Sequence, residues 1–511
     1  MGKTPFRLLL SVFILLLFAA AAFAQGTTSR VTGTVTDTSG AAISGATVTL
    51  TNEGTQTSLT TVTGDSGAYA FDLIQVGSYQ VTVEKQGFKK TVSNKNTVNI
   101  NQPATINVAL EVGDVAATVT IENTVEQVQT GSSGNIGSTI EQRTVEALPI
   151  VGVRGRNPLD LLNFQPGVVN NFGATTGGNV HVNGSRDRAF NFTLDGIDIN
   201  ESTAGGSNFT PLRPNPDSIQ EFQIVTTNAT AELGRSSGAQ VTFVTRSGTN
   251  RLTGNAFEYY QTPEFNANEY GNNLNGRPKN QFVQHIFGGS LGGPIIKNRL
   301  FFFTNLQLLR AYDTALVTRT VYTQAARNGF FRYVVGGQNA PTGTQTPSID
   351  GGGNPLFPNC SATITTACIA TYNIASNPSG VGIDPALAKA INAMPLPNNF
   401  SAGDGLNTAG FNFGSPQHER QYDFVSRFDY KITGNNSLYV RYAKGSQTSL
   451  GDSGNSGRPV FPDSPNLVNT FRTPKNLAIN DRWSPTANLT NEFIFGYSQF
   501  GFKFATAEPD A

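Results

Sequence analysis

Histidine, methionine, cysteine and tryptophan are scarce in this 511-residue chain, with 3, 2, 2 and 1 residues respectively. So few histidines and cysteines argue against a metal- or thiol-dependent enzyme, because such sites need several of these side chains. Neither sign of charge is in excess, since 35 basic residues balance 35 acidic ones. The lack of a basic surplus argues against a general nucleic-acid-binding protein.

Long apolar runs are also missing from the rest of the chain after residue 24. No stretch in that part reaches the roughly 18 apolar residues that a transmembrane helix needs. If the protein crosses a membrane, it must therefore do so as a β-barrel. Glycine is abundant at 54 residues, and phenylalanine and tyrosine contribute 35 and 14. This composition is typical of all-β proteins with many turns and aromatic girdles.

The N-terminus has the features of a secretory signal peptide. Lys3 and Arg7 precede an apolar run over residues 8–18, and the sequence Ala22-Phe23-Ala24 matches an A-x-A cleavage site. We expect residues 1–24 to direct export and cleavage to occur after Ala24. The alternative is an uncleaved N-terminal anchor helix.

Residues 30–112 alternate apolar and polar side chains with a period of two, and glycine-containing turns interrupt the pattern. Short strands at this spacing indicate a β-sandwich that folds alone. The predicted core includes Val35, Val48, Leu50, Tyr69, Phe71, Tyr79, Val81 and Val83. The segments "GTVTDTSGAAISGATVTL" and "TGDSGAYAFDLIQVGSYQVTVEKQGF" resemble the carboxypeptidase regulatory-like domain, which implies a transthyretin-like β-sandwich without catalytic residues of its own.

Residues 136–250 mix short helical and strand patterns, and "FTLDGIDIN" predicts a hairpin with Asp195-Gly196 as its turn. This stretch resembles the plug domain of TonB-dependent receptors, particularly the Oar-like branch that carries a regulatory-like domain in front. The resemblance implies an α+β plug. It rests on "ALPIVGVRGRNPLDLLNFQPGVV", "VHVNGSRDRAFNFTLDGIDIN", "SIQEFQIVTTNATAELGRSSGAQVTFVTRSGTN" and "FGGSLGGPIIKNRLFFFTNLQ", in the family's order, although "LPIVGVRGRN" is longer than the usual "LPLNGRN".

Residues 251–511 carry alternating aromatic and charged side chains, as a barrel wall between lipid and water requires. The alternation sets Tyr422, Phe424, Phe428 and Tyr430 against Asp423, Arg427, Asp429 and Lys431. Most of residues 311–420 are rich in Gly, Pro, Asn and Thr, which predicts long extracellular loops. The other residues of this region are enough for about ten strands of about 9–11 residues each, whereas plugged transporters have about 22 strands. We therefore expect a partial transmembrane antiparallel β-barrel from a C-terminally truncated chain that ends at "AEPDA".

The family resemblance implies a TonB-dependent outer-membrane receptor that imports an unidentified ligand with energy supplied from the periplasmic side. It implies three partners: the TonB complex, outer-membrane lipid and an extracellular ligand. No enzymatic activity, cofactor or nucleic-acid partner is expected. The alternative is a cell-surface binding or adhesion protein whose sandwich recognises carbohydrate or peptide without transport.

Residues 113–135 are polar and indicate a linker between sandwich and plug. By resemblance, Thr118, Val119, Thr120, Ile121 and Glu122 form the box that pairs with TonB. Strand addition would supply affinity through backbone hydrogen bonds, with little demand on side chains. The alternative interpretation is that these residues are the last strand or the linker of the sandwich.

Other motifs predict little chemistry, and no catalytic, cofactor-binding or metal-binding residue is expected. Ser290 stands in a G-x-S-x-G pattern, but a nucleophile elbow needs a strand-turn-helix setting, and this segment falls in a predicted barrel hairpin. Asp195 and Asp198 could bind calcium, although solvated turn carboxylates are the simpler expectation. Cys360 and Cys368 lie close together in an exported chain, which predicts a loop-closing disulfide.

Overall fold

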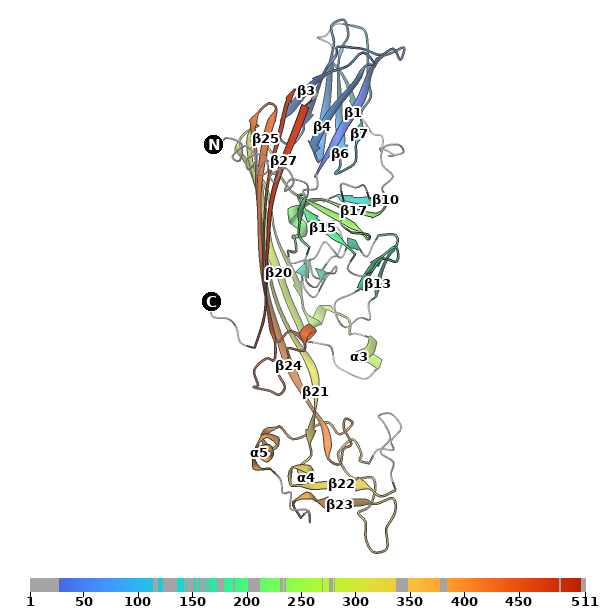
Figure 1. Cartoon of the computed structure of the whole chain (residues 1–511), viewed down its shortest axis with the longest axis vertical. Helices are drawn as coiled ribbons and strands as arrows, with labels where there is room; N and C mark the ends of the chain where they lie inside the picture. The colour runs from blue at the N-terminus through green and yellow to red at the C-terminus, as the bar shows by residue number, and fades with distance from the viewer. Residues whose placement is uncertain are drawn as a thin grey trace, which may run out of the picture.

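The computed structural model describes residues 27–113, 118–122, 136–141, 144, 151–152, 155–156, 161–162, 165–171, 179–186, 189–200, 212–229, 233, 236–268, 270–274, 279, 281–336, 348–376, 384–486 and 489–506. The expected signal peptide and its cleavage site after Ala24 lie outside these ranges. A sandwich, a plug and a long curved sheet make up most of the molecule, and a small module stands at the end opposite the sandwich (Figure 1).

The sandwich consists of two facing sheets. One has the order β4-β1-β7, with β8 also paired to β1, and the other has the order β3-β2-β5-β6-β9. Alternation places every second side chain between the sheets, and all the predicted core residues are at most 7% exposed, which confirms that prediction. The strands are β1 (Thr28–Asp37), β2 (Thr47–Asn52), β3 (Ser58–Val62), β4 (Ala68–Gln75), β5 (Gly77–Glu84), β6 (Lys90–Val98), β7 (Ala104–Thr105), β8 (Val108–Leu110) and β9 (Thr118–Glu122).

The plug is built on a five-stranded sheet of order β10-β17-β18-β15-β16, accompanied by the hairpins β11-β12 and β13-β14. The predicted turn joins β15 to β16, and Asp195 and Gly196 have φ values of 50° and 78°, as a two-residue type I′ hairpin requires. The elements are β10 (Ile136–Glu141), β11 (Val151–Gly152), β12 (Gly155–Arg156), β13 (Val168–Asn171), β14 (Asn179–Val182), β15 (Asn191–Leu194), β16 (Ile197–Asp198), the 3-10 turn η3 (Pro216–Ser218), β17 (Ile219–Thr227) and β18 (Gln240–Thr245).

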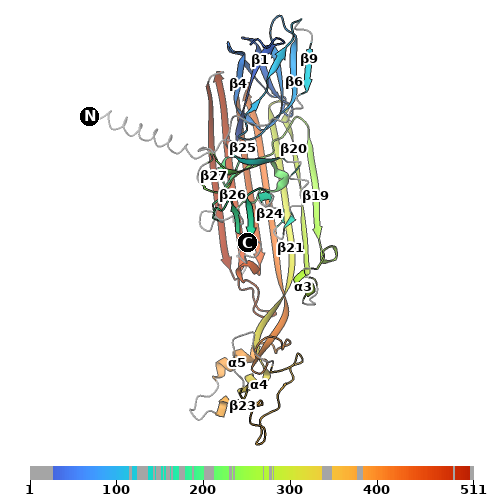
Figure 2. The ribbon, with the colours of Figure 1, turned by 90° about the vertical axis from the view of Figure 1, so that its right-hand side faces the viewer.

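The long curved sheet, here called the wall, has seven antiparallel strands in the order β19-β20-β21-β24-β25-β26-β27 (Figure 2). The strands are β19 (Thr253–Gln261), β20 (Gln281–Ile296), β21 (Leu300–Tyr322), β24 (Thr408–Thr433), β25 (Asn436–Leu450), β26 (Asn469–Thr486) and β27 (Leu489–Ala505). The fold is therefore mainly β, with an open partial barrel, as predicted.

The strand lengths differ from expectation. The longest wall strand has 26 residues, so the same stretch of chain yields fewer strands than the predicted ten or so. β21 continues to Tyr322 and β24 starts at Thr408, so both ends of the region 311–420 are strand rather than loop. The prediction failed there because it rested on composition, which does not show that the two segments pair with each other along the whole of β21, well beyond about 11 residues.

A small module spans residues 323–407 at the tip of the β21-β24 hairpin. Its core contains Ile349, Ile369 and Leu406. It holds α4 (Gln324–Arg327), β22 (Phe330–Val334), β23 (Ile369–Asn373), η6 (Ile374–Ser376) and α5 (Pro385–Ala393), while η5 (Pro263–Phe265), α3 (Tyr270–Leu274) and η7 (Ser453–Asn455) lie in loops of the wall. Across the described ranges, no helix is long and apolar enough to span a membrane.

The two faces of the wall differ as the alternation predicted. Arg427 and Arg441 are 4% and 0% exposed on the face that meets the plug. Phe428 and Phe495, on the outer face, are 45% and 48% exposed. The polar face is covered by the plug, and the aromatic face is left for lipid.

Candidate functional site

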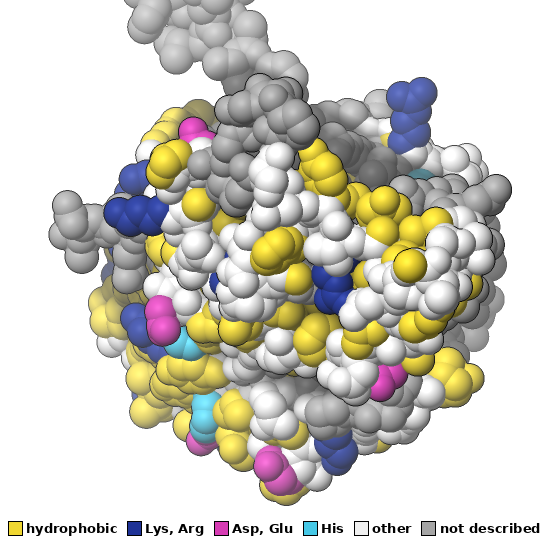
Figure 3. All heavy atoms as spheres, turned by 90° about the horizontal axis from the view of Figure 1, so that it is seen from below, with side chains coloured by type: hydrophobic (Ala, Val, Ile, Leu, Met, Phe, Trp, Pro, Cys, Tyr) yellow, Lys and Arg dark blue, Asp and Glu magenta, His cyan; other side chains and the backbone are white. Residues whose placement is uncertain are grey.

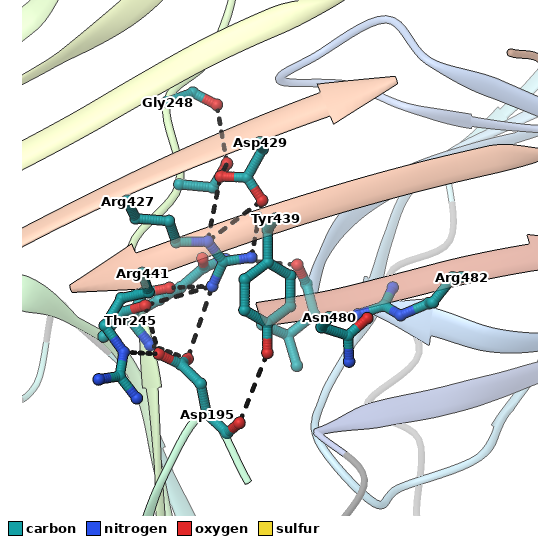
Figure 4. A network of polar contacts seen from close by, with 12 residues as sticks. Asp195, Thr245, Gly248, Arg427, Asp429, Tyr439, Arg441, Asn480 and Arg482 are labelled. Atoms are coloured by element: carbon teal, nitrogen blue, oxygen red, sulfur yellow. Dashed lines mark hydrogen bonds and ion pairs between the residues drawn. The ribbon is translucent and has the colours of Figure 1, made fainter. Parts of the chain in front are cut away.

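Asp195 occupies the tip of the β15-β16 hairpin and is fully buried. Both of its carboxylate oxygens accept hydrogen bonds from Thr245, the last residue of β18. The backbone N–H of Thr245 donates to Oδ1 at 2.9 Å, and its hydroxyl donates to Oδ2 at 2.8 Å. The plug sheet therefore fixes this carboxylate from the plug side, and the same oxygens also meet two arginines of the wall (Figure 4).

Arg441, on wall strand β25, closes the wall side of the contact. Its Nε donates to Asp195 Oδ2 at 2.9 Å, and the two side chains are 0% and 1% exposed. Its Nη2 also donates to the backbone oxygen of Leu194 at 2.8 Å, and its Nη1 contacts Asn476 on the next strand. One guanidinium group thus donates both to the Asp195 carboxylate and to the Leu194 backbone oxygen at the tip of the hairpin.

Arg427, on β24, approaches the same carboxylate from the neighbouring strand. Its Nη1 lies 3.5 Å from Asp195 Oδ1 and donates to the backbone oxygen of Thr245 at 3.1 Å. Its Nη2 pairs with Asp429 at 2.8 Å, and its guanidinium carbon lies 4.2 Å from the ring centroid of Tyr439. Asp195, Thr245, Arg427 and Arg441 together are called the plug-wall lock below.

The register of the wall explains why this lock needs an anion. Arg427 and Arg441 are directly opposite one another on β24 and β25. Like charges in such a cross-strand pair destabilise a sheet. The carboxylate of Asp195 lies between them and compensates both, so the wall presents a site that fits a plug carboxylate.

Further contacts join the plug to other strands of the wall. Arg156 forms a buried ion pair with Asp217, and its guanidinium carbon lies 4.7 Å from the ring centroid of Tyr259 on β19. The side-chain amide of Asn215 donates to Asn305 on β21 at 2.9 Å. On the two strands that carry the lock arginines, β24 and β25, the side chains of Val425 and Ala443 pack into the plug core.

The two aspartates considered as calcium ligands serve a different purpose. Asp195 is neither solvated nor open to a cation, because Thr245 and two arginines occupy both of its oxygens. Asp198 accepts two hydrogen bonds from Asn200, at 2.6 Å and 2.7 Å. The expectation of a solvated carboxylate is therefore wrong for Asp195, because a turn that the sequence places on a surface is here inserted into the wall. No group of metal-ligating side chains gathers in the described part of the chain.

Three further segments noted in the sequence lie on a wall strand, in the module and at the edge of the sandwich. Ser290 lies in the middle of strand β20, where its hydroxyl donates to Asn255 Oδ1 at 2.7 Å, so the setting of a nucleophile elbow is missing. Cys360 and Cys368 lie in the module with their Sγ atoms 2.04 Å apart. Residues 118–122 form β9, which pairs in parallel with β6 at the edge of the sandwich.

The lock was missed at the level of sequence. The alternation of β24 and β25 assigned Arg427 and Arg441 to the polar face, but nothing local indicated their partner. Asp195 and Arg441 are 246 residues apart in the chain. The available signal was the pair of arginines on facing strands, which is a combination that requires a nearby anion.

Comparisons with known proteins match three domains in order. The Carboxypeptidase regulatory-like domain matches residues 30–111, the TonB-dependent Receptor Plug Domain matches residues 136–241, and the Outer membrane beta barrel domain matches residues 244–511. The chain is 29% identical over 300 residues to the TonB-dependent transporter Oar of Myxococcus xanthus, which covers 56% of this chain and 27% of that protein. The chain thus spans about a quarter of the length of this curated relative.

Two solved structures have a partial likeness to this chain. The ferric enterobactin receptor of Pseudomonas aeruginosa is 12% identical, with 71% of this chain and 40% of that chain covered and a TM-score of 0.38. The siderophore receptor PirA of Acinetobacter baumannii is 13% identical, with 72% and 48% covered and a TM-score of 0.31. These overall likenesses are low and carry no argument by themselves. The barrel family covers more than half of the chain, with the regulatory-like and plug families in order before it, and the chain therefore belongs to the TonB-dependent outer-membrane receptors, a family of non-enzymatic outer-membrane proteins.

Proposed function

We propose that this chain provides the sandwich, the plug and part of the wall of a TonB-energised importer. A ligand would bind at the module end, TonB would act at the sandwich end, and the plug would shift along the wall. The observation that carries this proposal is the plug-wall lock, in which one buried plug carboxylate neutralises two facing wall arginines. Such a contact can break and re-form without covalent chemistry.

The lock suits a reversible seal better than a permanent one. A buried ion pair adds little net stability over apolar packing, because desolvation of the charges offsets most of their attraction. The ion pair does require one position of the plug, because Asp195 contacts both arginines only when the tip of the β15-β16 hairpin lies against the wall. The closed position of the plug is thereby specified without making its release prohibitively costly.

The face seen from the module end indicates what kind of ligand is favoured. Hydrophobic and uncharged side chains are interspersed there with scattered charges of both signs (Figure 3). A surface without a field of one sign does not steer a highly charged ligand. We infer that recognition relies on contact with polar and apolar groups, and the ligand itself is unidentified.

The alternative function, recognition by the sandwich without transport, finds no support in its described residues. An aromatic platform on the sandwich surface would favour carbohydrate or peptide binding. The large hydrophobic side chains exposed on this domain are Val62 and Val112, and Tyr69, Phe71 and Tyr79 are buried in its core. These two tyrosine rings and one phenylalanine ring therefore stabilise the fold rather than offer a binding surface.

A buried wall residue tests the proposed plug movement. Ala443 is 0% exposed and packs in the plug core. In cells growing on complex medium, Ala443→Cys should react with a membrane-impermeant maleimide only when TonB and the proton-motive force are present. Leu316→Cys, at a position that is 62% exposed, should react under all conditions. Equal labelling of Ala443→Cys with and without TonB contradicts the proposal.

A further inference from the structure

Two arginines lie opposite one another on the outer face of the wall, which is the face turned away from the plug (Figure 1). Arg310 on β21 and Arg420 on β24 are register partners. The chain neighbours of Arg310 are buried on the inner face, with Leu309 at 1% and Ala311 at 5% exposure. Successive side chains of a strand point to opposite faces, so Arg310 and its register partner both point outward.

These two arginines have no carboxylate partner among the described residues. Nη1 of Arg310 donates to two backbone oxygens, at 2.8 Å and 3.5 Å. The described carboxylates of this region are engaged elsewhere. Glu258, on the outer face of β19, contacts Nδ1 of His285 at 3.0 Å, and Asp313 is paired on the inner side of β21 at 2.8 Å.

The plug-wall lock shows what such a pair needs. Arg427 and Arg441 are register partners on the inner face, and the carboxylate of Asp195 lies between them. Like charges that face each other across two strands destabilise a sheet unless an anion compensates them. The outer pair has the same register relationship, but the anion has to come from outside the described part of the chain.

A second pair of like charges lies on the next two strands. Lys444 on β25 and Lys475 on β26 are register partners on the outer face. Nζ of Lys444 lies 5.8 Å from the ring centroid of Tyr422, whereas the register partner of Lys444 on β24 is Phe424. Tyr422 is two residues nearer to the module, so this lysine extends toward the level of the arginines. The four basic residues of the two pairs are called the basic belt below: Arg310, Arg420, Lys444 and Lys475.

The arginines of the belt lie at the module-side boundary of the aromatic face. Leu300 begins β21 at the sandwich end, ten residues before Arg310. Ten strand residues extend about 34 Å, and a tilt of about 35–45° leaves about 24–28 Å along the membrane normal, close to the apolar band of about 25 Å in outer-membrane barrels. Tyr312, the next outward residue, is 45% exposed, as an aromatic girdle at the membrane boundary requires. The arginines therefore lie at the level of the lipid headgroups.

The surroundings of the arginines fit a phosphate that carries acyl chains. Guanidinium groups bind phosphate oxygens through two parallel N–H donors, and clusters of basic residues at a membrane surface attract anionic headgroups. On the side toward the sandwich, the outer face of β21 continues with Leu308 and Leu306, and Leu306 is 41% exposed. A phosphate between the arginines leaves its acyl chains to lie along these apolar side chains. An aqueous anion would make no use of them.

We propose that the basic belt binds the phosphate headgroup of an anionic lipid in the leaflet on the module side. The phosphate compensates the outer pair of arginines as Asp195 compensates the inner pair. A charge-paired headgroup at one level also fixes the height of the wall in the leaflet. This proposal requires the wall to lie in a membrane, and it does not depend on TonB or on transport.

The binding of defined lipids to the purified full chain in a neutral detergent tests the site. Dioleoyl phosphatidylglycerol is anionic, and dioleoyl phosphatidylcholine carries the same phosphate and acyl chains without net charge. Native mass spectrometry should show that the unmodified chain binds phosphatidylglycerol at least about tenfold more tightly, and that Arg310→Gln with Arg420→Gln removes this preference. An unmodified chain without the preference, or a double variant that keeps it, would overturn the proposal.

Two further pairs of substitutions serve as controls. Arg251→Gln with Lys297→Gln removes the same charge from exposed positions at the sandwich end of the wall and should change the affinity for phosphatidylglycerol by less than about twofold. An equal loss would mean that net charge rather than the belt attracts the lipid. Arg310→Lys with Arg420→Lys should keep the preference at reduced affinity, because lysine supplies the charge without paired donors.

Inorganic phosphate in large excess over the lipid distinguishes a lipid site from a site for an aqueous anion. It should leave bound phosphatidylglycerol in place, because the acyl chains contribute to the binding of the lipid alone. Complete displacement of the lipid by inorganic phosphate would show that the arginines bind a soluble anion, contrary to the proposal.

Thermal unfolding separates loss of the site from loss of the fold. In lipid-free detergent, Arg310→Gln with Arg420→Gln removes two facing like charges and should leave the unfolding temperature unchanged or higher. Added phosphatidylglycerol should raise the unfolding temperature of the unmodified chain but not that of the double variant, because a ligand stabilises the folded state to which it binds. A double variant that unfolds at a lower temperature without lipid would show that the arginines already have an anion within the protein.

Discussion

Arg441 of the wall and Asp195 of the plug form an ion pair at 2.9 Å in which neither side chain is more than 1% exposed. The neighbouring Arg427 faces Arg441 across the two strands and reaches the same carboxylate at 3.5 Å. Arg427 has a second anion in Asp429, but the other partners of Arg441 among the described contacts are neutral. Arg441 therefore depends on Asp195 more than Arg427 does.

Replacing Asp195 by Asn should release the plug more easily. The change keeps the shape of the side chain but leaves Arg441 without a counter-charge, which for a buried pair costs about 3–5 kcal/mol. The measurement is the urea concentration at which the plug becomes sensitive to protease in detergent-solubilised protein. Asp72→Asn is the matched control, because its pair with Arg30 is half exposed and contributes at most about 1 kcal/mol. An equal effect of both substitutions would contradict the role given to the lock.

Removing both charges of the pair should be milder than removing one. The double variant Asp195→Asn with Arg441→Met leaves no buried charge unpaired at this position, and Arg427 retains Asp429. We expect it to recover more than half of the loss seen for Asp195→Asn alone, as replacement of a buried pair by apolar groups is often neutral. The same urea titration measures it. Strictly additive losses would show that the two side chains do not interact.

The isolated sandwich, residues 27–113, should fold alone and lose stability at alkaline pH. Burial raises the pKa of the Tyr69 hydroxyl well above its usual value of 10.0, and it also raises the pKa of Tyr79. The folded state keeps both neutral, so their contribution is present below pH 10 and declines as the pH rises above 10, where the unfolded chain ionises. Urea unfolding at pH 8 and pH 11 measures this loss.

Tyr69→Phe supplies the control for this pH dependence. It removes the hydrogen bond from the hydroxyl to the oxygen of Ile106 at 2.6 Å, which should cost about 1 kcal/mol at pH 8. It should also reduce the additional loss between pH 8 and pH 11, because one ionising group is gone. A helical circular-dichroism spectrum from residues 27–113 would refute the predicted sandwich altogether.

Proline substitutions in β9 should abolish energised uptake while ligand binding at the outer face survives. Proline fixes φ and removes a backbone donor, so Val119→Pro and Ile121→Pro disrupt an extended strand, whereas Val119→Ala should be mild. Uptake is to be measured in a receptor with a closed barrel that carries this segment. Normal uptake by both proline variants would place the box elsewhere, and unfolding of the sandwich by both would make β9 only its final strand.

The exported protein should contain no free thiol. Cys360 and Cys368 close a short loop in the module, and the chain-entropy model gives about 2–3 kcal/mol for such a bridge, less any strain. Because the module stands at the far end of the β21-β24 hairpin, reduction should destabilise the module locally and leave the plug-wall lock unchanged (Figure 1). Thiol titration of unreduced protein is the test, and two reactive thiols would exclude the bridge.

Local alternation alone determined much of this protein. A period of two assigned side chains such as Val81 to the sandwich core, and it separated Arg427 from Phe428 across the wall, because successive side chains of a strand point to opposite faces. The Asp195-Gly196 turn was also a local property, since only certain residue pairs adopt positive φ at both positions. These features needed no knowledge of the rest of the chain.

The tertiary structure determines which distant residues these local elements contact. The plug brings Asp195 to two arginines that lie more than 200 residues away in the chain, and it converts an expected solvated turn into a buried ion cluster. Likewise, pairing with β6 made residues 118–122 an edge strand rather than a free linker. Neither outcome is encoded in a local pattern, because charge compensation and strand partnership depend on which distant surfaces the fold brings together.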